Sequence, residues 1–223
     1  MRALTIAIDG PSGAGKGTVA RAIAARLGYR HVDSGAMYRA VGWKAAQEGV
    51  PFEDEERVAD LAAHSEIHVS PSAVTIDGTD VTRVIRTPEI DRAATSVARL
   101  PKVRAVLVER QRALGAHGGI VMEGRDIGTV VFPNADVKIY LDASPEERAR
   151  RRAQDPAHVG GPAAMNDVAG VASALHARDE SDRTRAVSPL YAATDAVVVD
   201  TTGQTVDQVV DQVLAVVYSF SQR

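Results

Sequence analysis

Nine consecutive residues close to the N-terminus have the types and spacing of a loop that binds phosphate. They are Gly10, Pro11, Ser12, Gly13, Ala14, Gly15, Lys16, Gly17 and Thr18. Glycines allow backbone N–H groups to surround an anion, and the N-terminus of a following helix adds partial positive charge. Lys16 can reach the β and γ phosphates of a nucleotide. An ordinary glycine-rich turn is the alternative, but it gives no reason for the lysine, so the loop predicts a nucleoside triphosphate as ligand.

The residue after the lysine departs from the most common form of this loop. That position usually holds a serine or threonine that binds Mg²⁺, whereas here it is Gly17 and the hydroxyl belongs to Thr18. The Gly-Lys-Gly-Thr form resembles the loop of the nucleoside monophosphate kinases. The resemblance implies ATP and Mg²⁺, with Mg²⁺ held largely by water and nucleotide phosphates and by no set of protein ligands. No Asn-Lys-x-Asp sequence, which reads guanine in GTPases, occurs in the chain.

The elements that must position this loop alternate along the chain. Apolar runs predict strands at 4–8, 31–32, 120–122, 137–141 and 196–199. Helical periodicity with proline and glycine boundary signals predicts helices at 16–27, 36–48 and 101–114, and further helices that begin at 145 and 205. This alternation predicts an α/β fold with a five-stranded parallel sheet and helices on both faces. The resemblance of the phosphate loop to that of the nucleoside monophosphate kinases implies the P-loop kinase type of this fold.

Two stretches interrupt the alternation. At about 61–97, alternating residues around Asp77-Gly78 predict an antiparallel hairpin insert on the substrate side. At about 150–185, a Pro/Gly/Ala-rich segment followed by a charged one predicts a mobile lid. We expect one domain, 1–223, that contains both.

Three further segments carry a specific resemblance. They are 33–39 (DSGAMYR), 123–133 (EGRDIGTVVFP) and 178–185 (RDESDRTR). Their sequences, their order and the place of the insert between the first two resemble those of the bacterial cytidylate kinases along the whole chain. The resemblance implies an ATP-dependent phosphotransferase that uses CMP or dCMP as acceptor. It implies that Ser34, Arg104 and Asp126 read the base with Arg185 close by, that Arg39 and Arg125 hold the acceptor phosphate, and that Thr95, Arg178 and Asp182 contact the sugar.

The chemistry of cytosine supports this interpretation independently. One edge of the base presents the N4 amino group as a donor and N3 and O2 as acceptors. A carboxylate such as Asp126 can accept from the amine while a guanidinium such as Arg104 donates to N3 or O2. Uracil reverses the polarity at N4 and N3, which would leave Asp126 without a partner at a cost of roughly 1–3 kcal/mol. The alternative is that Asp126 simply pairs with Arg125 or with a lid arginine.

Structural roles are open for several of the other residues. Ser34 could be only the N-cap of the next helix. The segment 178–185 could be a solvated helix face with an ion pair between Arg178 and Asp182. The same holds for Arg148, Arg150, Arg151 and Arg152, although Arg151 or Arg152 could flank the ATP.

The expected reaction needs no general base, because the phosphate oxygen of CMP is already ionised at neutral pH. Catalysis would then rest on positioning and on neutralising charge. We expect Lys16, Arg125, Arg183 and Arg185, together with Arg39 and Mg²⁺, to supply the positive charge. The six histidines share no motif.

Composition limits the other classes of function. A formal net charge of -3 argues against broad nucleic-acid binding, and the chain has no cysteine for disulfides or a thiolate zinc site. No apolar run is long enough for a signal peptide or a membrane helix, so we expect a cytoplasmic protein. We also expect a monomer, because no spare apolar helix face is evident.

Two alternatives to the expected function remain open. One is a kinase of the same fold that acts on UMP, AMP or a small metabolite, and the other is a non-catalytic regulator that binds ATP as a switch.

Overall fold

The computed structural model describes residues 3–155 and 168–221, and within them five parallel strands form the central sheet. The strands are β1 (Thr5–Asp9), β2 (Arg30–Asp33), β6 (Ile120–Glu123), β7 (Val137–Asp142) and β8 (Val197–Asp200), in the order β2-β6-β1-β7-β8. The central strands are buried runs of branched apolar residues, as expected for parallel strands covered on both faces. The predicted five-stranded parallel sheet is therefore confirmed.

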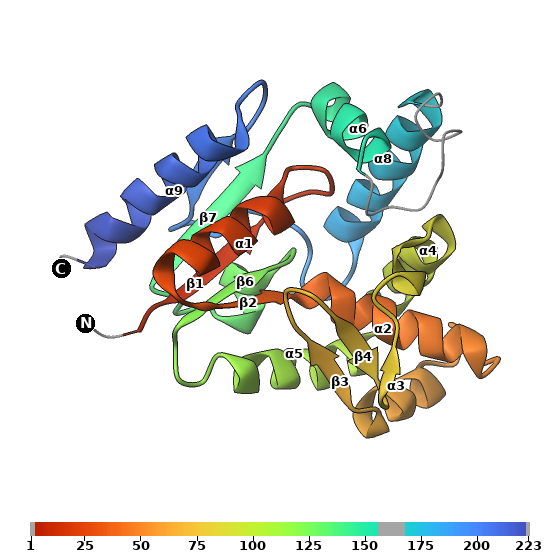
Figure 1. Cartoon of the computed structure of the whole chain (residues 1–223). Coiled ribbons are helices and arrows are strands. Elements are labelled where there is room, and N and C mark those ends of the chain that lie inside the picture. Colours follow the sequence, from red (N-terminus) through yellow and green to blue (C-terminus); the bar gives the residue numbers. More distant parts are fainter. Residues whose placement is uncertain (1–2, 156–167, 222–223) are drawn as a thin grey trace.

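Helices cover both faces of this sheet (Figure 1). On one face, α1 (Lys16–Leu27) and α9 (Val206–Ser221) bury Ile23 and Val213 against β1 and β7. On the other face, α5 (Pro101–Leu114) packs with a π-helical turn, η2 (Ile127–Val131), through Val108 and Ile127. Helix α1 has the predicted bounds. Helix α9 begins one residue after the predicted start, and Val206, which helical periodicity predicts to be buried, is instead 49% exposed in its first turn.

A second layer of elements lies beside the carboxyl edge of the sheet. It consists of α2 (Ser34–Gln47), α3 (Glu55–His64), β3 (Ile67–Val69), β4 (Val74–Ile76), β5 (Thr79–Asp80), a 3-10 turn η1 (Val84–Arg86) and α4 (Pro88–Val97). Strands β4 and β5 form the predicted hairpin, and Asp77 and Gly78 take the positive φ values that its tight turn requires. The insert is larger than a hairpin, since β3 adds a third antiparallel strand and α4 lies within 61–97.

In its described residues, the region predicted as a lid holds the end of α6 (Pro145–Ala153) and α8 (Val168–Thr184), which pack against each other (Figure 1). Helix α6 begins at residue 145 as predicted, and the Ser144 Oγ caps it by accepting a hydrogen bond from the Glu147 N–H at 3.2 Å. The residues 156–167 of the predicted lid lie outside the described residues. In the part of the chain that the structure describes, no helix is both long and apolar enough to cross a membrane.

Candidate active site

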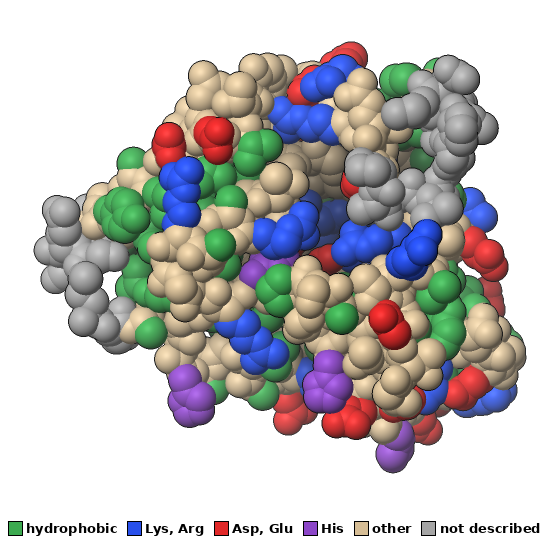
Figure 2. Space-filling model, in the orientation of Figure 1, with side chains coloured by type: hydrophobic (Ala, Val, Ile, Leu, Met, Phe, Trp, Pro, Cys, Tyr) green, Lys and Arg blue, Asp and Glu red, His purple; other side chains and the backbone are tan. Residues whose placement is uncertain are grey.

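A cavity of about 600 Å³ opens at the carboxyl edge of the parallel sheet, between the phosphate loop and helices α2, α4, α6 and α8. Lys and Arg side chains gather around this hollow in the middle of the molecule (Figure 2). The cavity brings together most of the predicted site residues: Ser12, Gly13, Ala14, Gly15, Lys16, Gly17, Thr18, Ser34, Arg39, Thr95, Arg104, Arg125, Asp126, Arg178, Asp182 and Arg185. Gly10 and Pro11 form the start of the loop behind the lining. Arg183 is exposed on α8, and the structure does not bring it to the cavity.

The phosphate loop joins β1 to α1 in the shape that its glycines allow. Gly13 has a φ of +81°, and a Cβ at this position would lie 2.8 Å from the Arg148 carbonyl oxygen. Both facts exclude a side chain here without rearrangement of α6. The loop is therefore held tightly between the sheet and the first turn of α6, with its backbone wrapped at the N-terminus of α1.

Lys16 is buried at the bottom of the cavity with only 7% of its surface exposed. Its Nζ donates to the Pro11 carbonyl oxygen at 2.7 Å, which points the ammonium group back into the loop. Burial first, and then the nearby charge of Arg125, lower the pKa of Lys16 to about 7. An anionic ligand beside Lys16 would therefore stabilise its protonated form and raise its pKa again.

Close packing explains the glycine that follows this lysine. A Cβ at Gly17 would lie 3.0 Å from the Glu123 Oε1, so the carboxylate at the end of β6 occupies the space that a serine or threonine would need. Glu123 is itself fixed by His31 of β2, whose Nε2 lies 3.1 Å from the same oxygen. The loop therefore faces a buried carboxylate where the more common form of the motif places a hydroxyl.

Asp126 and Arg104 form a buried ion pair at the far end of the cavity. Arg104 extends from the first turn of α5, stacks over the Tyr38 ring at 5.6 Å, and reaches Asp126 just beyond β6. Arg185 approaches the second carboxylate oxygen at 3.6 Å. Among the described residues the Arg104 Nε and Arg185 Nη2 are buried without a hydrogen-bond partner, which leaves donors for a ligand. Asp126 does pair with a lid arginine, but its main partner is Arg104 rather than Arg125.

A second cluster lies at the carboxyl end of β2. The Arg39 Nη2 contacts the Asp33 Oδ2 at 2.6 Å. Burial would raise the pKa of Asp33, but Arg39, and then Arg86 and His31, outweigh it and lower the pKa to about 2. Asp33 also caps α2 by accepting from the Ala36 N–H. The alternative role of Ser34 as the N-cap is therefore wrong, and the Ser34 Oγ instead donates to the Glu123 carbonyl oxygen at 2.7 Å.

Helix α8 contributes the third cluster. The Arg125 Nε donates to the Asp182 Oδ2 at 2.8 Å, and Arg125 is close enough to Lys16 of the phosphate loop to lower its pKa. Although burial opposes it, Arg125 lowers the pKa of Asp182. Arg178 pairs with Asp91 of α4 at 3.2 Å, not with Asp182 as a solvated face would have it. This ion pair joins α8 to α4. Within α4, the Thr95 Oγ1 donates to the Asp91 backbone carbonyl oxygen at 2.8 Å.

Comparison with known proteins decides the family of the chain. The model of the family described as cytidylate kinase matches residues 6–219. The chain belongs to the cytidylate kinase family. The cytidylate kinase of Desulfitobacterium hafniense is 49% identical over 95% of this chain and 91% of that protein, and the one of Solibacter usitatus is 45% identical over 97% and 93%. As a member of a kinase family, the chain is an ATP-dependent phosphotransferase that acts on small-molecule nucleotides.

The solved structures that resemble this kinase share its fold. A gluconokinase from Sinorhizobium meliloti superposes with a TM-score of 0.50 at 18% identity, covering 96% of this chain and 91% of that chain. A protein from Eubacterium ventriosum gives a TM-score of 0.51 at 13% identity, covering 97% of this chain and 98% of that chain. At such low identity the similarity extends to the α/β architecture alone.

The kinase also has site residues that the sequence pattern did not predict. Arg148 is buried beneath the phosphate loop, where its guanidinium donates to the Ser12 carbonyl oxygen at 3.2 Å and pairs with Asp179 of α8. The repeated arginines on α6 had predicted a solvated face. The sequence offers only the glycine at position 13 as a signal, because a glycine allows the close approach of another segment but does not say which one.

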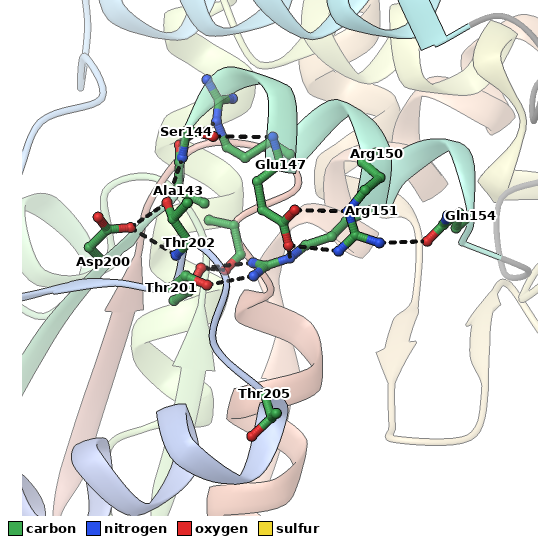
Figure 3. Close-up of polar contacts among 12 residues, drawn as sticks. Ala143, Ser144, Glu147, Arg150, Arg151, Gln154, Asp200, Thr201, Thr202 and Thr205 are labelled. Carbon is green, nitrogen blue, oxygen red and sulfur yellow. Dashed lines mark hydrogen bonds and ion pairs between the residues drawn. The ribbon is translucent and has the colours of Figure 1, made fainter.

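Helix α6 also contacts the loop after β8, where Arg151 points toward Thr201 (Figure 3). The Arg151 Nη2 donates to the Thr201 carbonyl oxygen at 2.6 Å, and its Nε donates to the Glu147 Oε1 at 2.8 Å. Hydrogen bonds from Arg150 and Arg151 outweigh burial and lower the pKa of Glu147 to about 2. The Thr201 Oγ1 donates in turn toward the Ala14 carbonyl oxygen at 3.3 Å. This chain of contacts ties α6 and the β8–α9 loop to the phosphate loop.

Proposed function

We propose that this chain transfers the γ-phosphoryl group of ATP to CMP or dCMP, giving ADP and CDP or dCDP. The observation that carries the proposal is the buried Arg104–Asp126 pair in the same cavity as the phosphate loop. A carboxylate beside a guanidinium matches the donor and acceptors on the cytosine edge. The names of the curated relatives support the same acceptor.

In this proposal the acceptor lies between α2 and α8. Asp126 and Arg104 read the base, with Ser34 and Arg185 beside it. Arg39 and Arg125 hold the phosphate, and the sugar contacts Thr95, Arg178 and Asp182. The donor occupies residues 10–18, and Arg151 flanks it beside Gly15, whose Cβ position lies 3.8 Å from the Arg151 Nη1. Thus the two phosphate sites share one cavity.

The chemical step would be an in-line displacement. A phosphate oxygen of CMP attacks the γ-phosphorus, a new P–O bond forms, and the bond to the β-phosphate oxygen breaks as ADP leaves. The attacking oxygen is already ionised, so no side chain has to remove a proton. Lys16, Arg125 and Arg185 neutralise the charge that develops on the transferring group. Closure of the predicted lid over both nucleotides would exclude water as a competing acceptor.

Mg²⁺ fits the residues present at the donor site. The described residues hold no cluster of three acidic or histidine side chains suited to a metal ion. The Thr18 hydroxyl and the Glu123 carboxylate do line the cavity beside the loop, and hard oxygen ligands together with phosphate oxygens and water suit this cation. When bound, Mg²⁺ would neutralise charge on the donor phosphates. The proposed site uses residues of a single chain, so a monomer would be sufficient for the reaction. We propose a monomer, with the cytoplasm as its compartment.

The experiment that tests this function is a coupled assay of ADP release with CMP, dCMP, UMP and AMP as acceptors. We expect CMP and dCMP to give the highest kcat/KM and UMP a value lower by roughly 10-fold or more. Preferred use of AMP or UMP would overturn the assignment of the base. ADP release with none of the four would favour a different acceptor or a regulator.

A further inference from the structure

The arginines that line the cavity differ in whether a carboxylate offsets their charge. Most of them form ion pairs within the site: Arg39, Arg104, Arg125, Arg150, Arg151, Arg152, Arg178 and Arg185. Arg21 and Arg86 also line it, yet no carboxylate of residues 3–155 or 168–221 lies within ion-pair distance of either. Arg21 is exposed on α1 beside Gly17, on the donor side. Arg86 comes from the insert, in the turn before α4, and has no site role so far.

The backbone of Arg86 is held rigidly by its two neighbours. Ile85 is completely buried in the core that the insert shares with α2 and α4. Thr87 is the N-cap of α4, and its side chain accepts from the Ile90 N–H at 3.3 Å. The turn η1 packs against both α2 and α4. A side chain that leaves the chain between a buried anchor and a helix cap starts from a fixed position, and this one lines the cavity.

Arg86 lies on the acceptor side, close enough to Asp33 to act on its carboxylate electrostatically. Asp33 already pairs with Arg39, and Arg125 already pairs with Asp182. Each of the two arginines proposed to hold the acceptor phosphate therefore has its charge offset by a carboxylate. A nucleoside monophosphate is close to a dianion at neutral pH. Two locally neutral pairs do not balance such a ligand, whereas an additional unpaired arginine contributes net positive charge.

We propose that Arg86 binds the phosphate of the acceptor nucleotide, together with Arg39 and Arg125. The insert then has a direct role in phosphate recognition as well as forming a wall of the cavity. This inference rests on the proposed function and extends it, because it adds a cation from the insert to the two paired arginines that hold the phosphate. The guanidinium suits the task because its planar donors can contact two phosphate oxygens at once.

The test compares Arg86→Ala and Arg86→Lys with Arg83→Ala, a matched control that removes an exposed arginine of the same insert outside the cavity lining. The readouts are the KM for CMP, the KM for ATP, and the inhibition constant of cytidine, which lacks the phosphate. For Arg86→Ala we expect the KM for CMP to rise roughly 10- to 100-fold, with ATP and cytidine changed less than about 2-fold. Arg86→Lys should recover part of the loss, and Arg83→Ala should behave as the unchanged protein.

Three results would overturn the inference. One is an unchanged KM for CMP in Arg86→Ala. Another is an equal loss for CMP and cytidine, which would show that the variant disturbs the base site or the insert instead of the phosphate contact. The third is a rise in the KM for ATP alone, which would place Arg86 on the donor. If the unchanged protein does not phosphorylate CMP at all, the proposed function fails instead, and the two failures are thereby distinguished.

Discussion

The low pKa of Lys16 predicts that ATP binding takes up a proton. In the free protein, burial and Arg125 lower this pKa to about 7, so Lys16 is about one-tenth protonated at pH 8. A bound triphosphate places several negative charges beside the ammonium group and restores an ordinary lysine pKa, which lies above 10. Lys16 is then almost fully protonated, and about 0.9 proton should be taken up for each ATP bound at pH 8. At pH 6 Lys16 already carries its proton, so this uptake should disappear.

Isothermal titration calorimetry with a non-hydrolysable ATP analogue measures this uptake directly. The titration is repeated in buffers of different ionisation enthalpy, and the slope of the apparent binding enthalpy gives the number of protons. Lys16→Met should remove the uptake. Lys44→Met removes a lysine of α2 that lies outside the cavity and pairs with Asp77, so it should leave the uptake unchanged. An uptake near zero at pH 8 in the unchanged protein would refute the account of Lys16.

Three further substitutions test separate parts of the site. Asp126→Ala should lower kcat/KM for CMP by roughly 10- to 100-fold and the value for UMP much less, and equal losses in steady-state assays would exclude base reading. Arg148→Ala leaves Asp179 buried without its cation, so urea unfolding should show that the free energy of unfolding falls by about 3–5 kcal/mol. The control Arg150→Ala removes an exposed arginine and should lower it by less than about 0.5 kcal/mol. Arg183→Ala should change kcat by less than about 2-fold, because the side chain is exposed and does not line the cavity. A large loss of kcat would show that Arg183 takes part in catalysis.

Local sequence was sufficient where the chemistry belongs to one continuous segment. The phosphate loop, the helix that begins at Lys16 and the turn at Asp77-Gly78 are set by glycines and by periodicity, and all three occur as predicted. The proximity of Arg104 and Asp126 could also be predicted from the sequence. One starts a helix and the other follows a strand, and the carboxyl edge of a parallel sheet brings such positions together.

Packing between distant segments could not be predicted in the same way. Arg148 lies in a charged run whose spacing is typical of a solvated face, and it is buried only because α6 sits on Gly13. Arg178 pairs with Asp91, a residue 87 positions away, in place of its helical neighbour Asp182. The choice between two carboxylates at similar reach depends on how α4 and α8 meet, which no local pattern encodes.

We propose that two phosphate sites share one cavity and face each other, so that the phosphoryl group is transferred directly. A crystal structure with a non-hydrolysable ATP analogue and CMP bound together tests it most directly. We predict the γ-phosphate at the loop of residues 10–18, the CMP phosphate between Arg39 and Arg125, and the cytosine edge on Asp126. A monophosphate bound anywhere other than next to the γ-phosphate would contradict the account.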